Sequence, residues 1–533
     1  MLRYDHGGRS ASAHFGGCHV TVKRTSEGLL TRHFDFRAAE PAWLERWGLH
    51  PAQHAKTRFS LAQPGAGAPW FLPMPPPNIT GALHLGHALF LTLQDIAIRH
   101  RLIRGDDALW IPGTDHAGLA THEKLCEDLP QRGLDPSDPA IYEREAWAWK
   151  HRFHARITSQ MRSMGAACAW DRERFTLDAS YQASAREAFR RIAHRGNLHR
   201  RDGQWYLDMR EPAAALLRAL DEGCIVIEPA TAIGRLRHFL ERIEPWCLSR
   251  QIPWGLRMPL HLRASGEWRI AEGAAPEGWH AETATFDTWF LSSLWPLALL
   301  GWPDDTPDLA RYYPAAWMET GEDILFFWCA RMLMMGWWLT GRWAFDRIHL
   351  QGLIRDKQGR KMSKSLGNGI DPLDLTATHG TDALRWMLAT HSEPGLDMRF
   401  NPATLAAEGK FLNKLWQAAR FISGAILSPP RPLDAESPFG RELASLTRQW
   451  DQGLLAADFK GTARRLQAHF RDAFCGGWLE THKEAWYAGD EATHAEGRAI
   501  LARYLILFHP YLPFITSEIQ ERLKLEVLSP DGH

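Results

Sequence analysis

The sequence predicts an α/β fold with a parallel sheet, followed by an almost wholly helical unit. Two observations predict the sheet: short apolar strands alternate with helical segments, and polar residues cluster just past the ends of the first two strands. The helical spacing of apolar residues from about Ala406 predicts the all-α unit. At 533 residues the chain is too long for one core, so we expect two to four domains.

The first half of the sheet is predicted within residues 34–139. Pro69 to Met74 has the composition of a buried strand, and after a proline-rich loop the apolar spacing becomes helical through about Arg101. A second strand, Ala108 to Ile111, is followed by the polar string PGTDH at 112–116. Since the carboxyl ends of parallel strands meet at one edge, both polar clusters are expected to border one crevice.

Residues 140–275 are predicted to form a connective region, helical and well charged at first and mixed after about residue 200. The second half of the sheet is expected in residues 276–405, where Trp317 to Thr320 and Arg347 to Leu353 have the composition of buried strands. Residues 406–533 form the helical unit, with a proline-rich joint at 428–432.

The bulk composition is that of an ordinary globular protein, with 45% hydrophobic and 23% charged residues. The 62 Lys and Arg balance 62 Asp and Glu, so any contact with nucleic acid must be local. Seven cysteines without CxxC spacing favour a reducing cytoplasm. The most apolar stretch is interrupted by Arg331, so we expect no membrane contact, and we expect a monomer. Residues 1–33, poor in acids, are expected to be an extension without fixed structure, a targeting segment or an overlong start.

A histidine pair, His84-Leu85-Gly86-His87, opens the first predicted helix. Two imidazoles three residues apart at a helix start can face a phosphate chain that the free backbone N–H groups already attract. Among 26 histidines about one such pair arises by chance, so the pair alone is equally compatible with a surface or core position.

A second motif, KMSKS at 361–365, follows a Gly-Arg turn. Lys361 and Lys364 are spaced so that both can clamp the β- and γ-phosphates of a nucleotide. A solvated basic turn is the ordinary explanation for a short lysine run. That explanation does not account for its position about 270 residues after the histidine pair in an α/β sheet.

Together the two motifs resemble the paired signatures of class I aminoacyl-tRNA synthetases. Longer strings resemble the valyl-tRNA synthetases of that class: PPPNITG at 75–81, WIPGTDHAG at 110–118, DTWF at 287–290 and TGEDILFFW at 320–328. The resemblance runs from about Phe34 to Leu523. It implies a Rossmann-type catalytic domain with a helical connective insertion, an all-α anticodon-binding-like domain, ATP and Mg²⁺ as cofactors, and valine and tRNA as partners.

The resemblance also implies a role for each matched residue. The residues implied in catalysis are His84, His87, Lys361 and Lys364. Those implied in ATP binding are Thr80, Gly86, Gly352, Ser363 and Ser365. Those implied in amino-acid binding are Pro75, Pro76, Asn78, Asp115, Trp289, Ile324 and Trp328.

The chemistry of these residue types agrees with those roles. A carboxylate such as Asp115 is the natural partner of an ammonium group in a crevice, and Trp289, Ile324 and Trp328 can wall a small apolar pocket. Plain core packing is the alternative for these three. Gly352 would let adenine approach the backbone, and no protein metal site is predicted.

The sequence departs from the valyl relatives in three places. After His199 the chain passes at once to QWYLDM at 204–209, a string that in those enzymes follows a large editing domain. We therefore predict activation of threonine without proofreading. The C-terminal coiled coil is also missing, and residues 431–533 carry 12 Lys and Arg against 15 Asp and Glu, a weak footprint for tRNA. Gln351 replaces a histidine.

Three functions remain open at this stage. The first is a compact valine–tRNA ligase. The second is a paralogue that supplies activated valine or valyl-tRNA to a biosynthetic pathway outside translation. The third is a catalytically inactive regulatory or binding protein, which complete phosphate-binding motifs disfavour because such loops add little to core stability.

Overall fold

The computed structural model describes residues 30–49, 67–362, 368–425, 433–434 and 436–525. Three predicted nucleotide-site residues, Ser363, Lys364 and Ser365, lie outside the described residues. Residues 1–29 of the expected extension and the whole proline-rich joint at 428–432 also lie outside the described residues.

The central parallel sheet has five strands, paired in two ladders with the orders β2–β1 and β14–β15–β7. A hydrogen bond from the Ala316 amide to the Phe71 carbonyl, 3.0 Å long, joins the β1–β2 pair to the other three strands. The strand order reverses between β1 and β14, which is the place where open α/β sheets bind ligands. The strands are β1(Pro69–Pro73), β2(Asp107–Ile111), β7(Val226–Glu228), β14(Met318–Gly321) and β15(Arg347–Gln351).

The four strands predicted from sequence are confirmed to within two residues at their ends. The fifth, β7, falls inside the segment 140–275 and pairs in parallel with β15 from Arg347 to His349. The connective segment therefore returns to the sheet before it ends. The strand is only three residues long and ends in Glu228, so it is too short to stand out in the sequence.

Helix α2(Leu85–Ile103) packs between the sheet and the C-terminal helices, and fourteen of its nineteen residues are buried. A helix that is buried on nearly all sides needs apolar residues around most of its circumference, as here. Its three buried charged or amide side chains, Gln94, Asp95 and Arg99, all have partners.

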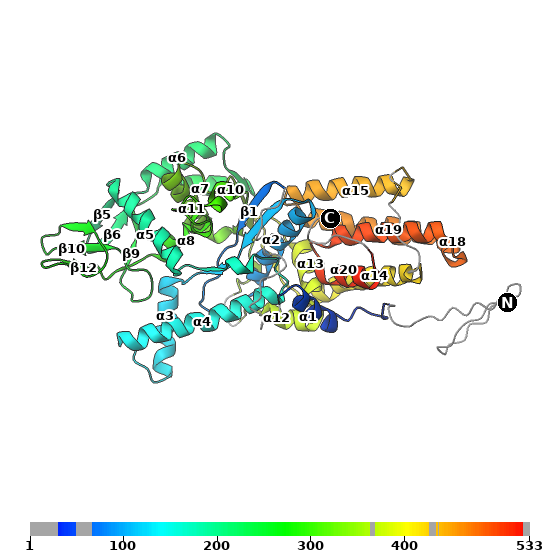
Figure 1. Cartoon of the computed structure of the whole chain (residues 1–533), viewed down its shortest axis with the longest axis horizontal. Coiled ribbons are helices and arrows are strands. Elements are labelled where there is room, and N and C mark those ends of the chain that lie inside the picture. Colours follow the sequence, from blue (N-terminus) through cyan, green and yellow to red (C-terminus); the bar gives the residue numbers. More distant parts are fainter. Residues whose placement is uncertain (1–29, 50–66, 363–367, 426–432, 435, 526–533) are drawn as a thin grey trace, which may run out of the picture.

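The connective region extends away from the sheet, at the left of Figure 1. Its hairpin β5–β6 is closed by Asp202 and Gly203, whose φ angles of 51° and 77° are those of a tight two-residue hairpin turn. The elements here are α3(Gly118–Gln131), α4(Pro139–Ser163), β3(Gly113–Thr114), β4(Arg174–Phe175), α5(Ala179–His194), β5(Leu198–Arg201), β6(Gln204–Leu207), α6(Arg210–Asp221), α7(Thr231–Glu241), β8(Trp246–Cys247), β9(Ser249–Arg250), β10(Leu260–Leu262), β11(Trp268–Ile270), β12(His280–Ala281) and β13(Thr285–Phe286).

Helices make up the other end of the molecule, at the right of Figure 1. The main ones are α13(Thr381–His391), α14(Pro402–Ile422), α15(Pro438–Leu455), α16(Phe459–His469), α18(Lys483–Ala488), α19(Glu491–Phe508) and α20(Pro513–Arg522). The remaining helices and strands are α1(Phe36–Arg46), α8(Thr288–Ser292), α9(Trp295–Leu299), α10(Pro307–Tyr312), α11(Ala330–Thr340), α12(Pro372–His379), β16(Ile354–Arg355) and β17(Met398–Arg399).

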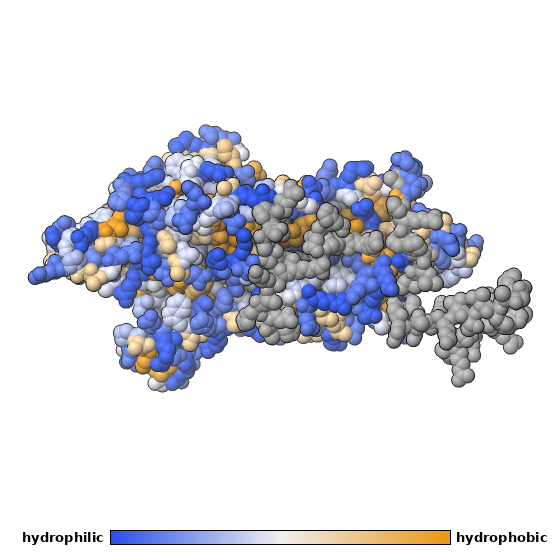
Figure 2. All heavy atoms as spheres, viewed as in Figure 1, coloured by the Kyte–Doolittle hydropathy of each residue, from blue (hydrophilic) through white to orange (hydrophobic). Residues whose placement is uncertain are grey.

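The surface of the connective region is largely hydrophilic on the face drawn in Figure 2, with small hydrophobic areas. Among the helices of the described residues, none combines the length and the apolar composition needed to cross a bilayer.

Candidate functional site

A cavity of about 740 Å³ opens at the carboxyl ends of β1, β14 and β15, where the strand order reverses. Its size suits a small ligand such as a nucleotide with an amino acid. Every predicted site residue that the structure describes lines it: His84, His87, Lys361, Thr80, Gly86, Gly352, Pro75, Pro76, Asn78, Asp115, Trp289, Ile324 and Trp328. The structure thus brings together residues up to 286 positions apart in sequence.

The loop 74–84, which forms one wall of the cavity, is held by side chains from other elements. The Trp295 indole donates to the Met74 carbonyl at 2.7 Å, and the Trp149 indole donates to the Ile79 carbonyl at 2.8 Å. The Gln160 amide oxygen accepts from the Leu83 amide at 2.8 Å. Since three consecutive prolines have no N–H for backbone pairing, side-chain contacts of this kind hold the loop in place.

The histidine pair forms the N-terminal cap of α2. His84 accepts the Gly86 amide hydrogen at Nδ1, and the His84 amide donates to Nδ1 of His87, each over 3.1 Å. A neutral imidazole whose Nδ1 accepts carries its proton on Nε2, so both rings keep an N–H donor. The ring centroids lie 3.9 Å apart beside the cavity.

Gly86 allows this arrangement. A Cβ atom at this position would lie 2.9 Å from Cε1 of His84, so any side chain would displace the ring. The glycine is therefore part of the geometry of the histidine pair.

Asp115 lies at the bottom of the cavity and is 3% exposed. Its backbone pairs with the loop after β1 through Asp115 N to Pro77 O at 3.0 Å, which sets it beside Asn78. Its Oδ1 accepts from the Ala117 amide at 2.7 Å and from Thr288 Oγ1 at 2.8 Å, and its Oδ2 accepts from Ser292 Oγ. A carboxylate has about four acceptor positions, so capacity remains for one more donor.

The neighbouring His116 does not compete for that position. It is fully buried, and burial lowers the pKa of its imidazole, so the ring beside Asp115 stays neutral. Its Nδ1 lies 2.8 Å from Thr176 Oγ1.

The apolar wall comes from two aromatic residues and one isoleucine. Trp328 is 2% exposed, and its indole donates to the Ser292 carbonyl at 3.0 Å, whereas Trp289 and Ile324 are half-buried. Trp328 lies in a π-helical turn, Leu325–Cys329, between β14 and α11. Such turns are rare and recur at functional sites because they re-aim side chains.

Lys361 also lines the cavity, and its Nζ lies 3.1 Å from Oδ2 of Asp323. Both side chains are about half exposed, so the pair can separate at little cost when another anion enters. Glycine was expected at position 352 to let adenine approach the backbone, but the structure shows another reason for a glycine there. Its added Cβ would meet the Leu396 carbonyl at 1.9 Å, so close contact with that segment requires the glycine.

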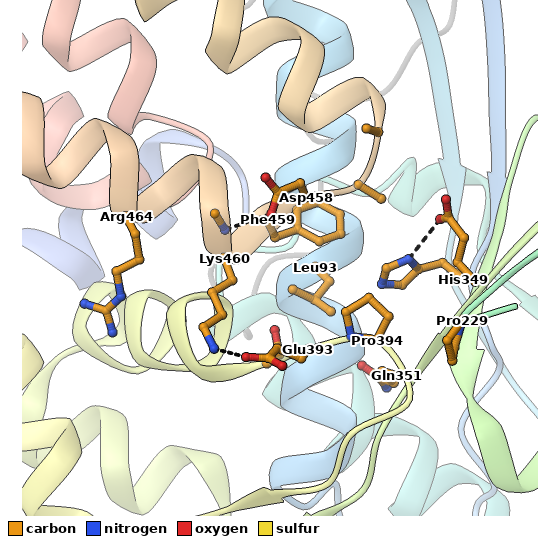
Figure 3. A pocket seen from close by; sticks show the side chains of 15 residues that line it. Leu93, Pro229, His349, Gln351, Glu393, Pro394, Asp458, Phe459, Lys460 and Arg464 are labelled. Carbon is orange, nitrogen blue, oxygen red and sulfur yellow. Dashed lines mark hydrogen bonds and ion pairs between the residues drawn. The ribbon is translucent and has the colours of Figure 1, made fainter. Parts of the chain in front are cut away.

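A second cavity of about 580 Å³ lies between the ends of β7 and β15 and the start of α16 (Figure 3). Lys460 forms an ion pair with Glu393 at its rim, and His349 lies 3.5 Å from Glu228. Gln351 borders both cavities, and its buried Oε1 has no hydrogen-bond partner among the described residues.

Sequence reasoning missed several contributors. Thr288 and Ser292 hold Asp115, and Asp323 and Lys124 also line the first cavity. Thr288 and Ser292 are four residues apart on a short helix, a spacing that places both on one face and could have identified them. Among the described residues, no group of three His, Cys, Asp or Glu side chains is arranged to hold a metal ion.

Comparison with known proteins decides the family. The sequence profile described as tRNA synthetases class I (I, L, M and V) matches residues 43–203, 201–275 and 273–401, a region that contains every residue of the first cavity. The chain belongs to this family. The matched stretches of this class I synthetase adjoin at 201–203, where the β5–β6 hairpin turns, and at 273–275.

Curated relatives and solved structures agree with the family. The synthetase is 29% identical to the valine–tRNA ligase of Carboxydothermus hydrogenoformans, over 91% of this chain and 78% of that one. It is 28% identical to the valine–tRNA ligase of Geobacillus stearothermophilus, over 92% and 78%.

Two solved structures share the fold. The agnB2 LeuRS of Agrobacterium radiobacter K84, in a ternary complex with tRNA and LeuAMS, has a TM-score of 0.75 at 15% identity and covers 94% of this chain and 90% of its own. The methionyl-tRNA synthetase of Mycobacterium tuberculosis with methionyl-adenylate has a TM-score of 0.69 at 18% identity, with coverage of 85% and 93%. The Rossmann-type α/β architecture is confirmed.

Proposed function

We propose that this class I synthetase activates valine with ATP to valyl-adenylate and transfers it to tRNA without proofreading. The observation that carries the proposal is that one cavity is lined by Asp115 and Asn78, by a small apolar wall, and by both the histidine pair and Lys361. These are the groups that an α-amino acid and a triphosphate require side by side.

The reaction needs positioning rather than a protein nucleophile. A carboxylate oxygen of valine attacks the α-phosphorus in line, a new O–P bond forms, and the bond to pyrophosphate breaks. The Nε2–H groups of His84 and His87 and the ammonium of Lys361 donate to the oxygens on which negative charge develops. Lys364 would add a fourth donor.

Magnesium would arrive with the nucleotide, held mainly by phosphate oxygens. Asp323 lines the phosphate end of the cavity and can supply one carboxylate once Lys361 turns to the phosphates. Mg²⁺ prefers such sites of one or two carboxylates plus phosphates, so the residues present fit the ion.

Valine is the amino acid that we propose for this site. The remaining acceptor position of Asp115 takes one ammonium hydrogen, with Asn78 and the Pro76 carbonyl nearby. Trp289, Ile324 and Trp328 surround a branched side chain with apolar atoms. The names of the relatives at 28–29% identity support the same substrate.

Two observations support the lack of a proofreading domain within the chain. The hairpin β5–β6 closes with a two-residue turn at the point where the family profile breaks. The alignment with the Carboxydothermus enzyme runs over 700 positions, more than the 533 residues present here, so the relative carries additional segments.

Amino-acid-dependent exchange of pyrophosphate into ATP tests the proposal. We expect exchange with valine, about a hundredfold weaker exchange with threonine, and less with isoleucine. Charging of total tRNA supports the tRNA ligase, whereas adenylate formation without charging supports the paralogue that uses activated valine elsewhere. No exchange with any amino acid would leave only an inactive binding protein.

A further inference from the structure

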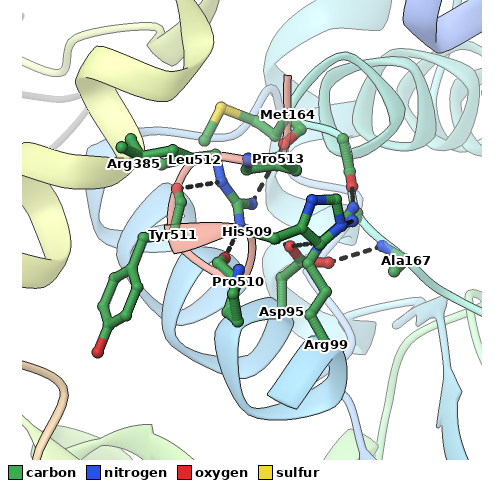
Figure 4. Close-up of polar contacts among 12 residues, drawn as sticks. Asp95, Arg99, Met164, Ala167, Arg385, His509, Pro510, Tyr511, Leu512 and Pro513 are labelled. Atoms are coloured by element: carbon green, nitrogen blue, oxygen red, sulfur yellow. Dashed lines mark hydrogen bonds and ion pairs between the residues drawn. The ribbon is translucent and has the colours of Figure 1, made fainter. Parts of the chain in front are cut away.

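The buried charges on helix α2 connect the nucleotide end of the first cavity to the C-terminal helices. The first turn of α2 carries His84 and His87. Eight residues further on, about 12 Å along the helix axis, Asp95 and Arg99 project into a cluster of polar groups (Figure 4).

Asp95 is completely buried and shared between two arginines. Its Oδ2 accepts from Arg99 Nε at 2.7 Å and from Arg385 of α13 at 2.6 Å, and its Oδ1 accepts from the Ala167 amide at 2.8 Å. Burial alone would raise the pKa of Asp95, but the two guanidinium groups hold it below its usual value. The carboxylate is therefore charged and fully paired.

The two arginines continue the contacts into the C-terminal segment. Arg385 donates to the Pro510 carbonyl at 2.8 Å and to the Tyr511 carbonyl at 3.2 Å. Arg99 donates to the Gly165 carbonyl at 2.8 Å and lies 3.2 Å from His509 Nε2. Burial lowers the pKa of His509 to about 3, so its neutral ring accepts from Arg99 and its Nδ1 faces Thr516 at 3.0 Å.

The opposite face of α2 is fixed to the sheet. Gln94 donates to both the carboxylate and the carbonyl of Glu319 in β14, at 2.8 and 3.1 Å, and accepts from the Trp110 indole of β2 at 3.0 Å. The helix is thus held between the sheet and residues 509–516. None of Asp95, Arg99, Arg385 and His509 is among the described residues that line the first cavity.

We infer that Asp95, Arg99 and Arg385 are positioning residues for ATP. They fix the rotation and axial position of α2 against the C-terminal helices, and through the rigid first half of the helix they set the histidine pair against the phosphates. The helical end of the chain therefore takes part in amino-acid activation even when no tRNA is bound. This inference rests on the proposed function, because it assumes that ATP binds at the histidine pair.

Binding of MgATP to the full-length protein by calorimetry, without amino acid, tests the inference. Arg385→Lys keeps the charge beside Asp95 but cannot reach both carbonyls. We expect it to weaken ATP binding between about tenfold and a hundredfold. His509→Phe removes the acceptor for Arg99 and should weaken binding several-fold, whereas His509→Gln retains an acceptor and should bind like the wild type.

Asp451→Asn is the matched control. Asp451 of α15 pairs with His100 and Arg104 at the far end of α2, is partly exposed and lies outside the cluster. This variant should bind ATP normally. Melting temperatures of all variants distinguish weaker binding from loss of fold. If Arg385→Lys does not fold, the comparison of His509→Phe with His509→Gln tests the inference.

Variants that melt earlier but bind ATP like the wild type below their melting temperature would overturn the inference, because the cluster would then be structural only. The wild type could bind ATP, with weaker binding in the Arg385→Lys and His509→Phe variants, and yet show no valine-dependent exchange. That result would refute the proposed function and leave the inference intact. A wild type without ATP binding would overturn both.

Discussion

The position of the His84 ring beside the cavity depends on the absence of a Cβ atom at residue 86. The Gly86→Ala substitution places a methyl group 2.9 Å from the His84 ring and forces it away from the cavity. Since a preorganised donor to developing charge is worth about a hundredfold or more, we expect valine-dependent exchange to fall by at least about tenfold, with a higher KM for ATP.

Gly409→Ala is the control for that change. Gly409 lies in α14, and an added Cβ meets no atom within 4 Å. This variant should keep full exchange activity and gain a fraction of a kcal/mol in stability, about 0.5–1. Equal activity of Gly86→Ala and Gly409→Ala would refute the role of the His84 ring.

The hydroxyl groups around Asp115 give the second test at this scale. Ser292→Ala removes the donor to Oδ2, so the carboxylate loses the contact that aims it into the cavity. We expect the KM for valine to rise by roughly tenfold, equivalent to about 1.4 kcal/mol, while the KM for ATP stays within about twofold.

Ser293→Ala provides the comparison, since Ser293 is also buried but donates to the Phe290 carbonyl at 2.7 Å and does not contact Asp115. Steady-state exchange kinetics of both variants, with valine and ATP varied separately, would show the difference. A similar KM for valine in the two variants would contradict the positioning of Asp115 by Ser292.

Residue identities at the site could be predicted from sequence, but their connections could not. His84, Asp115 and Lys361 stand out because they belong to recognisable strings. The pairing of Lys361 with Asp323, and the contact of Gly352 with Leu396, depend on backbone paths that no local pattern encodes.

At the scale of elements, strand β14 carries a buried carboxyl group that makes stability depend on pH. Glu319 is completely buried with one hydrogen bond from Gln94, and burial raises its pKa to about 8. The folded protein thus binds this proton more tightly than the unfolded chain. The resulting stability is complete below about pH 4.5 and is lost as the pH rises through 8, at up to about 1.4 kcal/mol per pH unit.

Glu319→Gln removes this dependence and keeps the contact to Gln94. We expect the free energy of unfolding of the variant, relative to the wild type, to increase between about pH 5 and pH 8 and to level off above that, where Glu319 is deprotonated in both states. Urea unfolding at about three pH values in that range measures it. Other buried carboxyl groups such as Glu40 and Asp382 are present in both proteins and cancel in the difference. A difference that does not change with pH would contradict a protonated Glu319 at neutral pH.

Elements differ in how far the sequence predicts them. Strands β1 and β2 are predicted because their apolar runs end in clear breaks. Strand β15 alternates polar and apolar residues, the period of a strand, and β14 follows the apolar Trp317 and Met318. Strand β7 is too short, and its partner β15 is some 120 residues away. The π-helical turn that aims Trp328 inserts one residue into a helix, and the energy of that insertion depends on packing rather than on composition.

The whole molecule joins its two ends through contacts of very long range. Arg385 and Asp95 are separated by 290 residues, and Arg99 and His509 by 410. The sequence predicts a helical unit after the sheet, but not that three buried ionised side chains connect it to α2, since charged residues are mostly exposed. A joint of this kind is visible only when the packing of both units is known.

The short connection between β5 and β6 also affects how well the protein can discriminate between valine and threonine. An apolar pocket discriminates poorly against a ligand that exchanges a methyl group for a hydroxyl, and about a hundredfold is the value known for the valyl enzymes themselves rather than one calculated from this cavity. With β5 and β6 joined by two residues, the chain has no inserted unit at that point. We therefore expect threonine, with ATP and tRNA, to yield threonyl-tRNA that persists for as long as valyl-tRNA does. Gel separation of charged and uncharged tRNA, with ATP consumption followed in parallel, measures this; rapid ATP hydrolysis with threonine while the tRNA remains uncharged would show that the protein removes the wrong amino acid by another route.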